Sequence, residues 1–266
     1  MVEVQNGTPY SADPSAPGTA MTVLLALLAL FAAPSCDAPG HTYGDRPTAC
    51  EVREIALPAT GALVVDNGVS GSVSVGAWDR DEVSVVATLR AYGSDERSPT
   101  ELLAATTIET DGGVRNVTRG GGWVEVAYRV RVPRATGLTV ETRNGSIAVE
   151  GVVGRHRLTT RNGSLRLADV GGDVRAETAN GSVTVVASGG TWEGDGLDVS
   201  TRNGNVLLEV PATYDALVEA STRYGSISDG SDDGRWARET SRQYLGAGGP
   251  TLRLSTGMGR VLVTRS

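Results

Sequence analysis

The second half of the chain alternates hydrophobic and polar positions with a period of two on both sides of a recurring Asn-Gly pair. In the first such unit, Val140 and Thr142 precede the pair that begins at Asn144, and Ile147 and Val149 follow it. This alternation is typical of strands with one buried face. Each unit therefore predicts a strand, a corner and a second strand.

The unit recurs six times, and its frame Thr-x-Asn-Gly is kept or only partly altered. The corner glycines are Gly145, Gly163, Gly181, Gly204, Gly225 and Gly259, with spacings of 18, 18, 23, 21 and 34 residues. A repeat of about 20 residues is typical of one coil of a solenoid with insertions at its corners. The predicted fold is all-β: a single-stranded parallel β-helix or solenoid, with a right-handed coil favoured, preceded by an irregular β segment.

Asn-Gly alone also fits a hairpin turn, so an antiparallel meander is the competing interpretation. Parallel coils are favoured because they place identical residues on one another, and stacked Asn side chains hydrogen-bond along the stack. The corner ladder expected from this stacking consists of Asn144, Asn162, Asn180 and Asn203. The Thr hydroxyls of the frame would face the interior and need partners there.

The sequence before the regular repeats predicts strands of less regular spacing. Residues 51–133 are assigned to an irregular β segment that continues into the solenoid coils of residues 134–266. Residues 62–75 look like a diverged coil, and Ser98-Pro99-Thr100-Glu101 has the form of a capping box with Pro at the first helical position. A short helix is therefore expected after Ser98.

These motifs resemble the bacterial "putative adhesin" family of β-strand-repeat proteins. The resemblance is carried by Val64-Val65-Asp66-Asn67 leading to Gly71-Ser72-Val73, by Tyr128-x-Val130-x-Val132-Pro133, and by the Thr-x-Asn-Gly-Ser coils that end in Leu254-Ser255-Thr256. It covers roughly residues 55–265. The resemblance implies a β-helix-like fold in an exported or membrane-linked protein of largely unassigned function, and it brings no catalytic residues.

The N-terminus indicates export. Residues 22–33 form an uncharged apolar run of twelve, which is too short to cross a bilayer but has the length of a signal-peptide core. Met21 directly precedes this run and is the expected translation start, so residues 1–35 are assigned to an N-terminal extension plus an export signal. Residues 36–50 are then a tether.

Cys36 has two interpretations. It ends the small-residue stretch Ala33-Pro34-Ser35, as in a bacterial lipobox, which predicts a lipidated Cys36 at the mature N-terminus and a protein anchored in the cell envelope. The only other cysteine is Cys50, so the alternative is signal cleavage followed by a Cys36–Cys50 disulfide in an oxidising compartment. Both interpretations place the protein in the periplasm or at the outer surface.

Composition and charge narrow the function. The chain has 35 glycines and a single Phe, which disfavours a helical bundle built on large apolar side chains. Its 24 basic residues, all arginines, are outnumbered by 31 acidic residues, for a net charge of −7. A nucleic-acid partner is therefore not expected.

Candidate catalytic and metal-binding groups are sparse. Glu141 and Glu177 fall at matching outward positions two coils apart, which leaves a β-helix carbohydrate-active enzyme as an alternative, although solvated charge explains them more simply. His41 lies in the tether and His156 at a coil corner, and neither suggests a metal site or a triad. A weak calcium candidate is Asp229, Ser231 and Asp233, where the loop lacks its closing carboxylate. No enzyme activity, metal or cofactor is predicted.

The sharpest functional candidate is a column of arginines. One arginine precedes the corner Asn or its equivalent in four coils, at Arg143, Arg161, Arg202 and Arg223, and Ala179 interrupts the column. Either Glu141 and Glu177 balance these charges, or the column is an anion-binding stripe for acidic polysaccharide, anionic lipid or a partner protein's carboxylates. The overall prediction is a binding, adhesion-like or structural module at the cell envelope; a scaffold that self-assembles through an uncapped C-terminal coil is a further alternative.

Overall fold

The computed structural model describes Cys36, residues 47–68, 70–228 and 239–266 of the 266-residue chain. Its contacts divide the chain into two units, Met1–Ala33 and Pro34–Ser266. All described residues belong to the second unit. The apolar run, His41 and the calcium candidate at Asp229, Ser231 and Asp233 lie outside the described residues.

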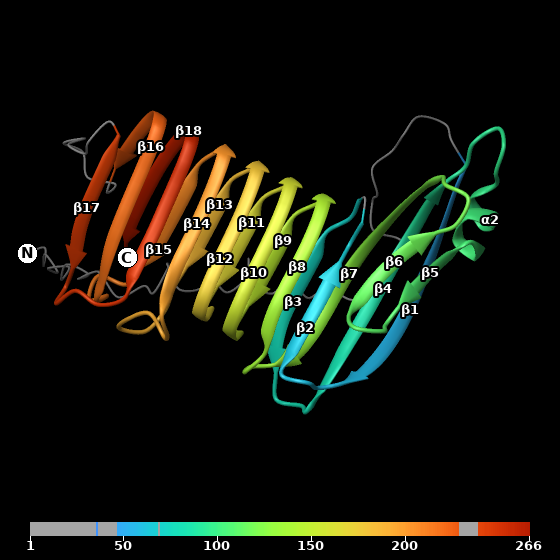
Figure 1. The fold of residues 1–266 in the computed structure, drawn as a ribbon, viewed down its shortest axis with the longest axis horizontal. Helices are drawn as coiled ribbons and strands as arrows, with labels where there is room; N and C mark the ends of the chain where they lie inside the picture. Colours follow the sequence, from blue (N-terminus) through green and yellow to red (C-terminus); the bar gives the residue numbers. More distant parts are fainter. Residues whose placement is uncertain (1–35, 37–46, 69, 229–238) are drawn as a thin grey trace, which may run out of the picture. The chain divides into compact units, whose positions relative to one another are not determined.

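In its described residues the second unit is a stack of β coils with one short helix (Figure 1). The N-terminal elements are β1 (Thr48–Pro58), β2 (Ala62–Asp66), β3 (Val73–Trp78), β4 (Glu82–Tyr92), α2 (Pro99–Ala104), β5 (Thr106–Glu109), β6 (Val114–Thr118) and β7 (Trp123–Pro133). The repeated coils contribute β8 (Gly137–Asn144), β9 (Ile147–Glu150), β10 (Val153–Asn162), β11 (Leu165–Ala168), β12 (Gly171–Asn180), β13 (Val183–Val186), β14 (Gly196–Asn203) and β15 (Val206–Val210). The last strands are β16 (Ala216–Ser228), β17 (Thr240–Leu245) and β18 (Thr251–Arg265).

Each coil places one strand on each of two faces, which we call face A and face B. Face A has the strand order β5–β6–β2–β8–β10–β12–β14–β18–β16–β17, and face B has the order β1–β4–β7–β3–β9–β11–β13–β15–β18–β16. The long strands β16 and β18 turn the corner and contribute to both faces. All neighbouring coils pair in parallel, as the repeat predicts, and the antiparallel meander is excluded.

The interior is filled by the alternate residues of both faces. On face A, Val140, Leu158 and Val199 are completely buried, and on face B the same holds for Ile147 and Leu165. Aliphatic residues recur at these positions because every coil needs the same inward row. The core is therefore a continuous column of Val, Leu and Ile between the two faces.

The C-terminal strand β18 does not lie at the end of the stack. β18 pairs with β14 on one side and with β16 on the other, so the sixth repeat lies between the fourth and the fifth. The antiparallel strand β17 then covers the face A edge of β16. The C-terminal residues Val261 and Val263 are buried inside the stack, which corrects the expectation that they form an uncapped end available for self-assembly.

The other end of the stack is irregular, as the sequence predicts. The first coil, β2–β3, stacks directly on β8 and β9, and the intervening chain forms antiparallel pairs outside it. Helix α2 has the expected capping box, in which Ser98 and Glu101 hydrogen-bond reciprocally. Strand β1 begins at Thr48, inside the stretch assigned to the tether. None of the helices in the described ranges has the length and apolarity needed to cross a membrane.

Candidate functional site

The corner between faces A and B is built by the Thr-x-Asn-Gly frame. Each buried Thr hydroxyl donates a hydrogen bond to the corner glycine carbonyl of a neighbouring coil: Thr160 to Gly145 at 2.9 Å, and Thr178 to Gly163 at 2.8 Å. The same bond joins Thr142 to Gly71, Thr201 to Gly181, Thr256 to Gly204 and Thr222 to Gly259. The buried Thr hydroxyls of the frame are thus satisfied by backbone carbonyl groups of the corner glycines.

The asparagines of the frame form one hydrogen-bonded row along the stack. Asn162 donates through Nδ2 to Oδ1 of Asn144, Asn180 to Asn162, and Asn203 to Asn180, each at 2.8 Å. At the end of the row, Oδ1 of Asn203 has no hydrogen-bond partner, because the next coil carries Met258 at this position. The amide row is a structural element that fixes the register of the corner.

The arginines lie on the outside of face A, one residue before this corner. Thr142, Thr160, Thr178 and Thr201 are in register, and so are the four asparagines. The residues between them therefore form one exposed column. Thr201 pairs with Thr256 and Thr222 with Thr256, so the full order across the coils is Arg143, Arg161, Ala179, Arg202, Gly257 and Arg223. The column is interrupted twice, at Ala179 as expected and also at Gly257.

The carboxylates expected to balance this column do not reach it. Glu177 instead accepts hydrogen bonds from Arg175, two residues earlier on the same strand, at 2.8 and 3.1 Å, and these bonds raise the pKa of Arg175. Among the residues that the structure describes, Arg143, Arg161, Arg202 and Arg223 make no ion pair with any carboxylate. The column therefore has no direct ion pair, although Glu141, Glu177 and Glu239 line the trough beside it.

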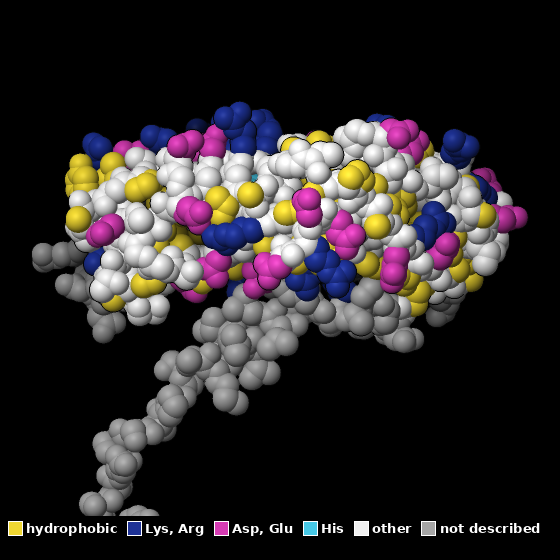
Figure 2. Space-filling model, turned by 90° about the horizontal axis from the view of Figure 1, so that it is seen from below, with side chains coloured by type: hydrophobic (Ala, Val, Ile, Leu, Met, Phe, Trp, Pro, Cys, Tyr) yellow, Lys and Arg dark blue, Asp and Glu magenta, His cyan; other side chains and the backbone are white. Residues whose placement is uncertain are grey.

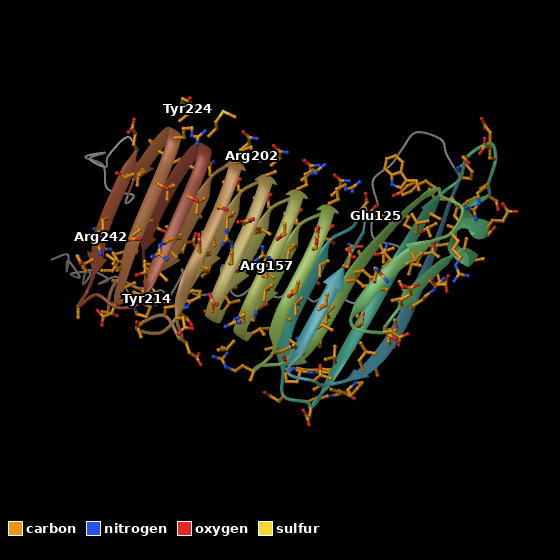
Figure 3. All side chains as sticks on the ribbon, in the orientation of Figure 1. Glu125, Arg157, Arg202, Tyr214, Tyr224 and Arg242 are labelled. Atoms are coloured by element: carbon orange, nitrogen blue, oxygen red, sulfur yellow. A yellow bond between two sulfur atoms is a disulfide. The ribbon has the colours of Figure 1, made fainter. Side chains whose placement is uncertain are left out.

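A shallow trough runs along face A beside the column. One stretch, of about 580 Å³, lies over β8, β10, β12 and β14 and is lined by Arg143, Arg161 and Arg202. A second stretch, of about 630 Å³, continues from Arg202 to Arg223 over β18 and β16. Figure 3 shows Arg202 at the upper edge of the molecule and Arg157 in the middle of the strands.

The floor of the trough is polar and low. The outward residues two positions before the arginines are Glu141, Thr159, Glu177, Ser200, Ser255 and Ser221, in coil order. Four of the six are hydroxyl residues with short side chains, and Glu177 is held by Arg175. The trough therefore offers hydroxyl groups and the Glu141 carboxylate on its floor and guanidinium groups along one wall, and Glu239 lines its second stretch.

Elsewhere on face A several charged side chains are paired, although Arg157 is exposed and makes no ion pair with a described carboxylate. Arg253 and Arg242 both pair with Glu219, at 3.1 and 3.5 Å, and Arg155 lies 3.5 Å from Asp173. Acidic and basic side chains are likewise interspersed on the surface seen in Figure 2. Other described arginines, such as Arg157 and Arg166, also lack an ion pair, and the column differs from them because its arginines are aligned along one trough.

The histidine expected at a coil corner lies elsewhere. His156 is an inward residue of β10, 1% exposed, in register with Leu138 and Val174. Its Nε2 lies 3.1 Å from the carbonyl oxygen of Val152, and burial lowers its pKa. His156 is therefore a core residue at an inward position between two outward arginines, which the sequence interpretation missed.

The described residues assemble neither a pair of catalytic carboxylates nor a metal-binding cluster. Glu141 and Glu177 are separated by the coil that carries Thr159, and Glu177 is engaged by Arg175. No group of three or more His, Cys, Asp or Glu side chains that could hold a metal ion occurs there. The prediction that the protein is not an enzyme stays a prediction.

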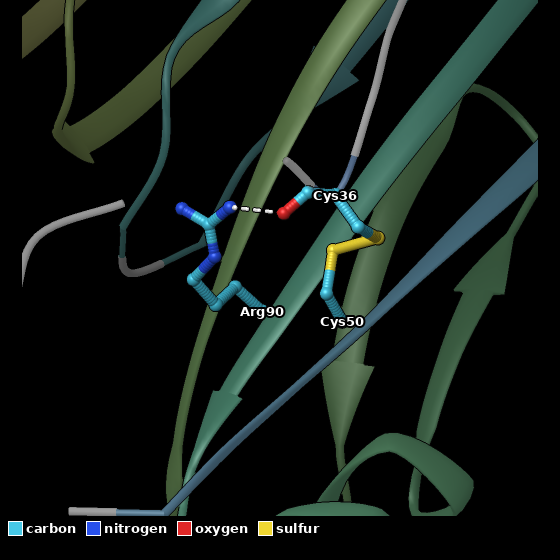
Figure 4. The surroundings of a disulfide bond; sticks show 3 residues. All are labelled: Cys36, Cys50 and Arg90. Carbon is cyan, nitrogen blue, oxygen red and sulfur yellow. Dashed lines mark hydrogen bonds between the residues drawn. A yellow bond between two sulfur atoms is a disulfide. The ribbon is translucent and has the colours of Figure 1, made fainter. Parts of the chain in front are cut away.

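Cys36 forms a disulfide with Cys50 on β1, and its carbonyl oxygen accepts a hydrogen bond from Arg90 at 3.4 Å (Figure 4). A sulfur in a disulfide cannot also carry the thioether-linked lipid of a lipoprotein. In this structure Cys36 therefore has the alternative role that the sequence left open, and the favoured diacylated form is not the one observed.

The sequence interpretation missed the order of the last coils along the trough and at its corner. Gly257 and Ser255 enter it only because β18 lies between β14 and β16. Tyr224 and Met258, which replace the corner asparagines, pair with each other and are 69% and 54% exposed. The 34-residue spacing between Gly225 and Gly259 was the one available signal that the last repeat is connected differently.

One comparison with known proteins identifies the type of domain. The model of the Toastrack DUF4097 family matches residues 62–256. No curated protein shows significant sequence similarity to the chain.

Among solved structures, a putative cell adhesion protein from Clostridium sporogenes is 9% identical and aligns over 83% of this chain and 100% of its own, with a TM-score of 0.46. A putative adhesin from Bacteroides fragilis (11% identity, 82% and 97% coverage, TM-score 0.38) and a putative lipid binding protein from Parabacteroides distasonis (10%, 82% and 96%, 0.38) also align.

Proposed function

This chain belongs to the Toastrack DUF4097 family, and from that premise we propose that it is a non-catalytic module that binds anionic ligands through the trough on face A, outside the cytoplasm. The observation that carries the proposal is the column of Arg143, Arg161, Arg202 and Arg223, which has no carboxylate partner in the described part of the chain. The family match also accords with the resemblance drawn from the corner motifs.

Electrostatics supports an anionic ligand. Arg143 and Arg161 lie on adjacent strands, about 4.8 Å apart, and the other arginines of the column lie on every second strand. Their like charges repel one another, and an anion laid along them relieves that repulsion. Arginine presents several donors in a planar fork that fits carboxylate and phosphate groups, so each column position can form a charge-assisted contact. The protein carries a net charge of −7, which means that any retention on an anionic surface must come from a local feature.

The proposed location rests on two features. A Cys36–Cys50 disulfide is expected to persist only in an oxidising environment. The apolar run of residues 22–33 fits an export signal. An envelope protein anchored by lipid on Cys36 is the competing form of the same exported chain, since the two forms use the same sulfur.

The two other function classes have less support. A carbohydrate-active enzyme would need converging carboxylates, whereas Glu177 is held by Arg175 and lies two coils from Glu141. Self-assembly through the last strand has lost its premise, because β18 lies inside the stack.

The test is a double charge reversal in the trough. Wild type and Arg161→Glu/Arg202→Glu are compared on heparin and on anionic vesicles, at low and at physiological salt. The matched control is Arg119→Glu/Arg265→Glu, which changes the net charge equally at two exposed arginines outside the trough. We expect wild type and control to be retained, with retention falling as salt rises, and the trough variant to flow through. Equal retention of all three proteins, or retention of none, overturns the proposal.

A further inference from the structure

Because β18 lies between β14 and β16, the arginines of the column are regularly spaced. From Arg161 onward the column reads Arg161, Ala179, Arg202, Gly257, Arg223, so an arginine recurs on every second coil. Strands stack about 4.8 Å apart, which places these arginines roughly 10 Å from one another along the trough. Had β18 stacked last, Arg202 and Arg223 would lie on adjacent coils.

The gap at Gly257 is enforced by the backbone. A Cβ atom at this position would lie 2.6 Å from the carbonyl oxygen of Arg202, so no side chain fits there without a shift of the backbone. At the other gap, Ala179 is half-buried and ends at its methyl group. The charged positions thus alternate with low, uncharged ones.

The floor has one short polar side chain beside most of these positions. Ser200 lies in the coil of Arg202, Ser255 in the coil of Gly257, and Ser221 in the coil of Arg223. Ser and Thr hydroxyls both donate and accept hydrogen bonds. Each of these coils can therefore contact a ligand's own hydroxyl groups, whether or not it also provides a charge.

We propose that the ligand is a linear polysaccharide in which acidic and uncharged sugars alternate, laid along the trough across the strands with one sugar per coil. This inference rests on the proposed function and names its ligand class. A pyranose unit in an extended chain advances by about one strand spacing, ~5 Å, so carboxylates on alternate sugars would meet Arg161, Arg202 and Arg223 in turn. The uncharged sugars then lie over Ala179 and Gly257, where there is room for them.

A membrane surface fits the alternation less well. Lipid headgroups are mobile in the plane of the bilayer and can gather beside arginines at any spacing. A polymer has a fixed interval between its charges, and only such a ligand distinguishes a column with gaps from a continuous one. Anionic vesicles therefore serve as the comparison arm of the test.

The experiment measures binding of the full-length protein to four probes at physiological salt. They are hyaluronan, in which acidic and uncharged sugars alternate, polygalacturonate, in which every sugar is acidic, neutral dextran, and vesicles containing phosphatidylglycerol. We expect wild type to bind hyaluronan at least as tightly as polygalacturonate despite its lower charge density, and not to bind dextran.

A variant that fills a gap tests the spacing directly. Ala179→Arg makes the arginine column continuous from Arg143 to Arg202. This variant should bind polygalacturonate about two- to fivefold more tightly, which is the effect of one exposed charge contact. Its affinity for hyaluronan should be unchanged. The matched control, Thr184→Arg, adds the same charge on the outside of β13 on face B and should alter neither.

Each contrary result has a distinct meaning. If wild type prefers polygalacturonate, or Ala179→Arg tightens both polymers equally, the trough binds anions without reading their spacing; this inference then fails and the proposed function stands. Binding to vesicles but to neither polymer also overturns the inference in favour of a membrane surface. Binding to no anionic probe overturns both.

Discussion

The corner glycines are constrained by the neighbouring coil as well as by the turn. A Cβ atom on Gly163 would lie 2.0 Å from the carbonyl oxygen of Gly145, and one on Gly181 would lie 2.1 Å from that of Gly163. These same carbonyls accept the Thr hydroxyl bonds. The Asn-Gly motif therefore indicates a close approach of neighbouring coils in addition to a turn.

Replacing one of these glycines should be severely destabilising. We expect Gly163→Ala to lower the free energy of unfolding by about 3 kcal/mol or more, because the backbones of two coils must separate. The control is Gly190→Ala, where an added Cβ meets nothing within 4 Å, with an expected change within about 0.5 kcal/mol. Chemical denaturation of both variants measures the difference, and similar small losses in both would contradict the close-approach argument.

His156 makes stability depend on pH. Its folded-state pKa is lowered by burial, so below the unfolded value of about 6.5 the unfolded chain binds the proton first and stability falls as pH falls. The slope is at most about 1.4 kcal/mol per pH unit for one proton. We expect His156→Leu to flatten this part of the profile, measured by denaturation between neutral and mildly acidic pH. An unchanged slope would assign the dependence to other groups.

At the scale of the elements, the asparagine row should contribute a modest amount per rung. Asn162 is exposed and bonds to the amides of Asn144 and Asn180 rather than to the backbone. We expect Asn162→Leu to lower the free energy of unfolding by about 1–2 kcal/mol through loss of these two hydrogen bonds.

Met258→Asn should instead raise the free energy of unfolding by about 0.5–1 kcal/mol. The new amide could donate a hydrogen bond to the unpartnered Oδ1 of Asn203. If Asn162→Leu and Met258→Asn change the free energy of unfolding in the same direction, the asparagine row does not stabilise the stack rung by rung.

The order of the coils was the part of the fold that the sequence did not determine. The frame Thr-x-Asn-Gly specifies how any coil stacks on another, and this predicted parallel pairing, the corner and the inward rows. Thr256 satisfies the frame equally well beside Thr201 or Thr222, so the motif cannot say which neighbours β18 takes. The arginine column was predicted as a set of residues, but its spacing depends on that order.

The position of β18 can be tested by deleting residues 251–266. In a stack that follows the sequence, this deletion removes an end coil and leaves the rest protected. Here β18 supplies the hydrogen-bond partners of both β14 and β16 and buries Leu252 and Val263. We therefore expect hydrogen exchange to show loss of protection in β16 and β17 together with β14, while β8 and β10 stay protected. Retained protection in β16 would contradict the interior position.

At the scale of the whole molecule, antiparallel strands flank the parallel coils on both sides. β4 to β7 lie outside the first coil, and β17 covers the face A edge of β16. Covered edges limit the pairing of one molecule with the next, whereas the face B part of β16 pairs only with β18 among the described strands. Among the described residues, the trough is a surface on which four arginines without ion pairs are aligned, which suits a binding module.

The state of Cys36 decides how such a module is held in its compartment. With the Cys36–Cys50 disulfide, the protein carries no free thiol and no lipid on sulfur. We expect protein isolated from the host envelope to take up no alkylating reagent before reduction and two equivalents after it, by intact-mass measurement. Reduction should also lower stability by up to about 3 kcal/mol, as expected for closing a short loop. A diacylated Cys36 would instead give a lipid mass increment and one alkylated thiol at Cys50 without reduction, and that result would replace the disulfide with a membrane anchor.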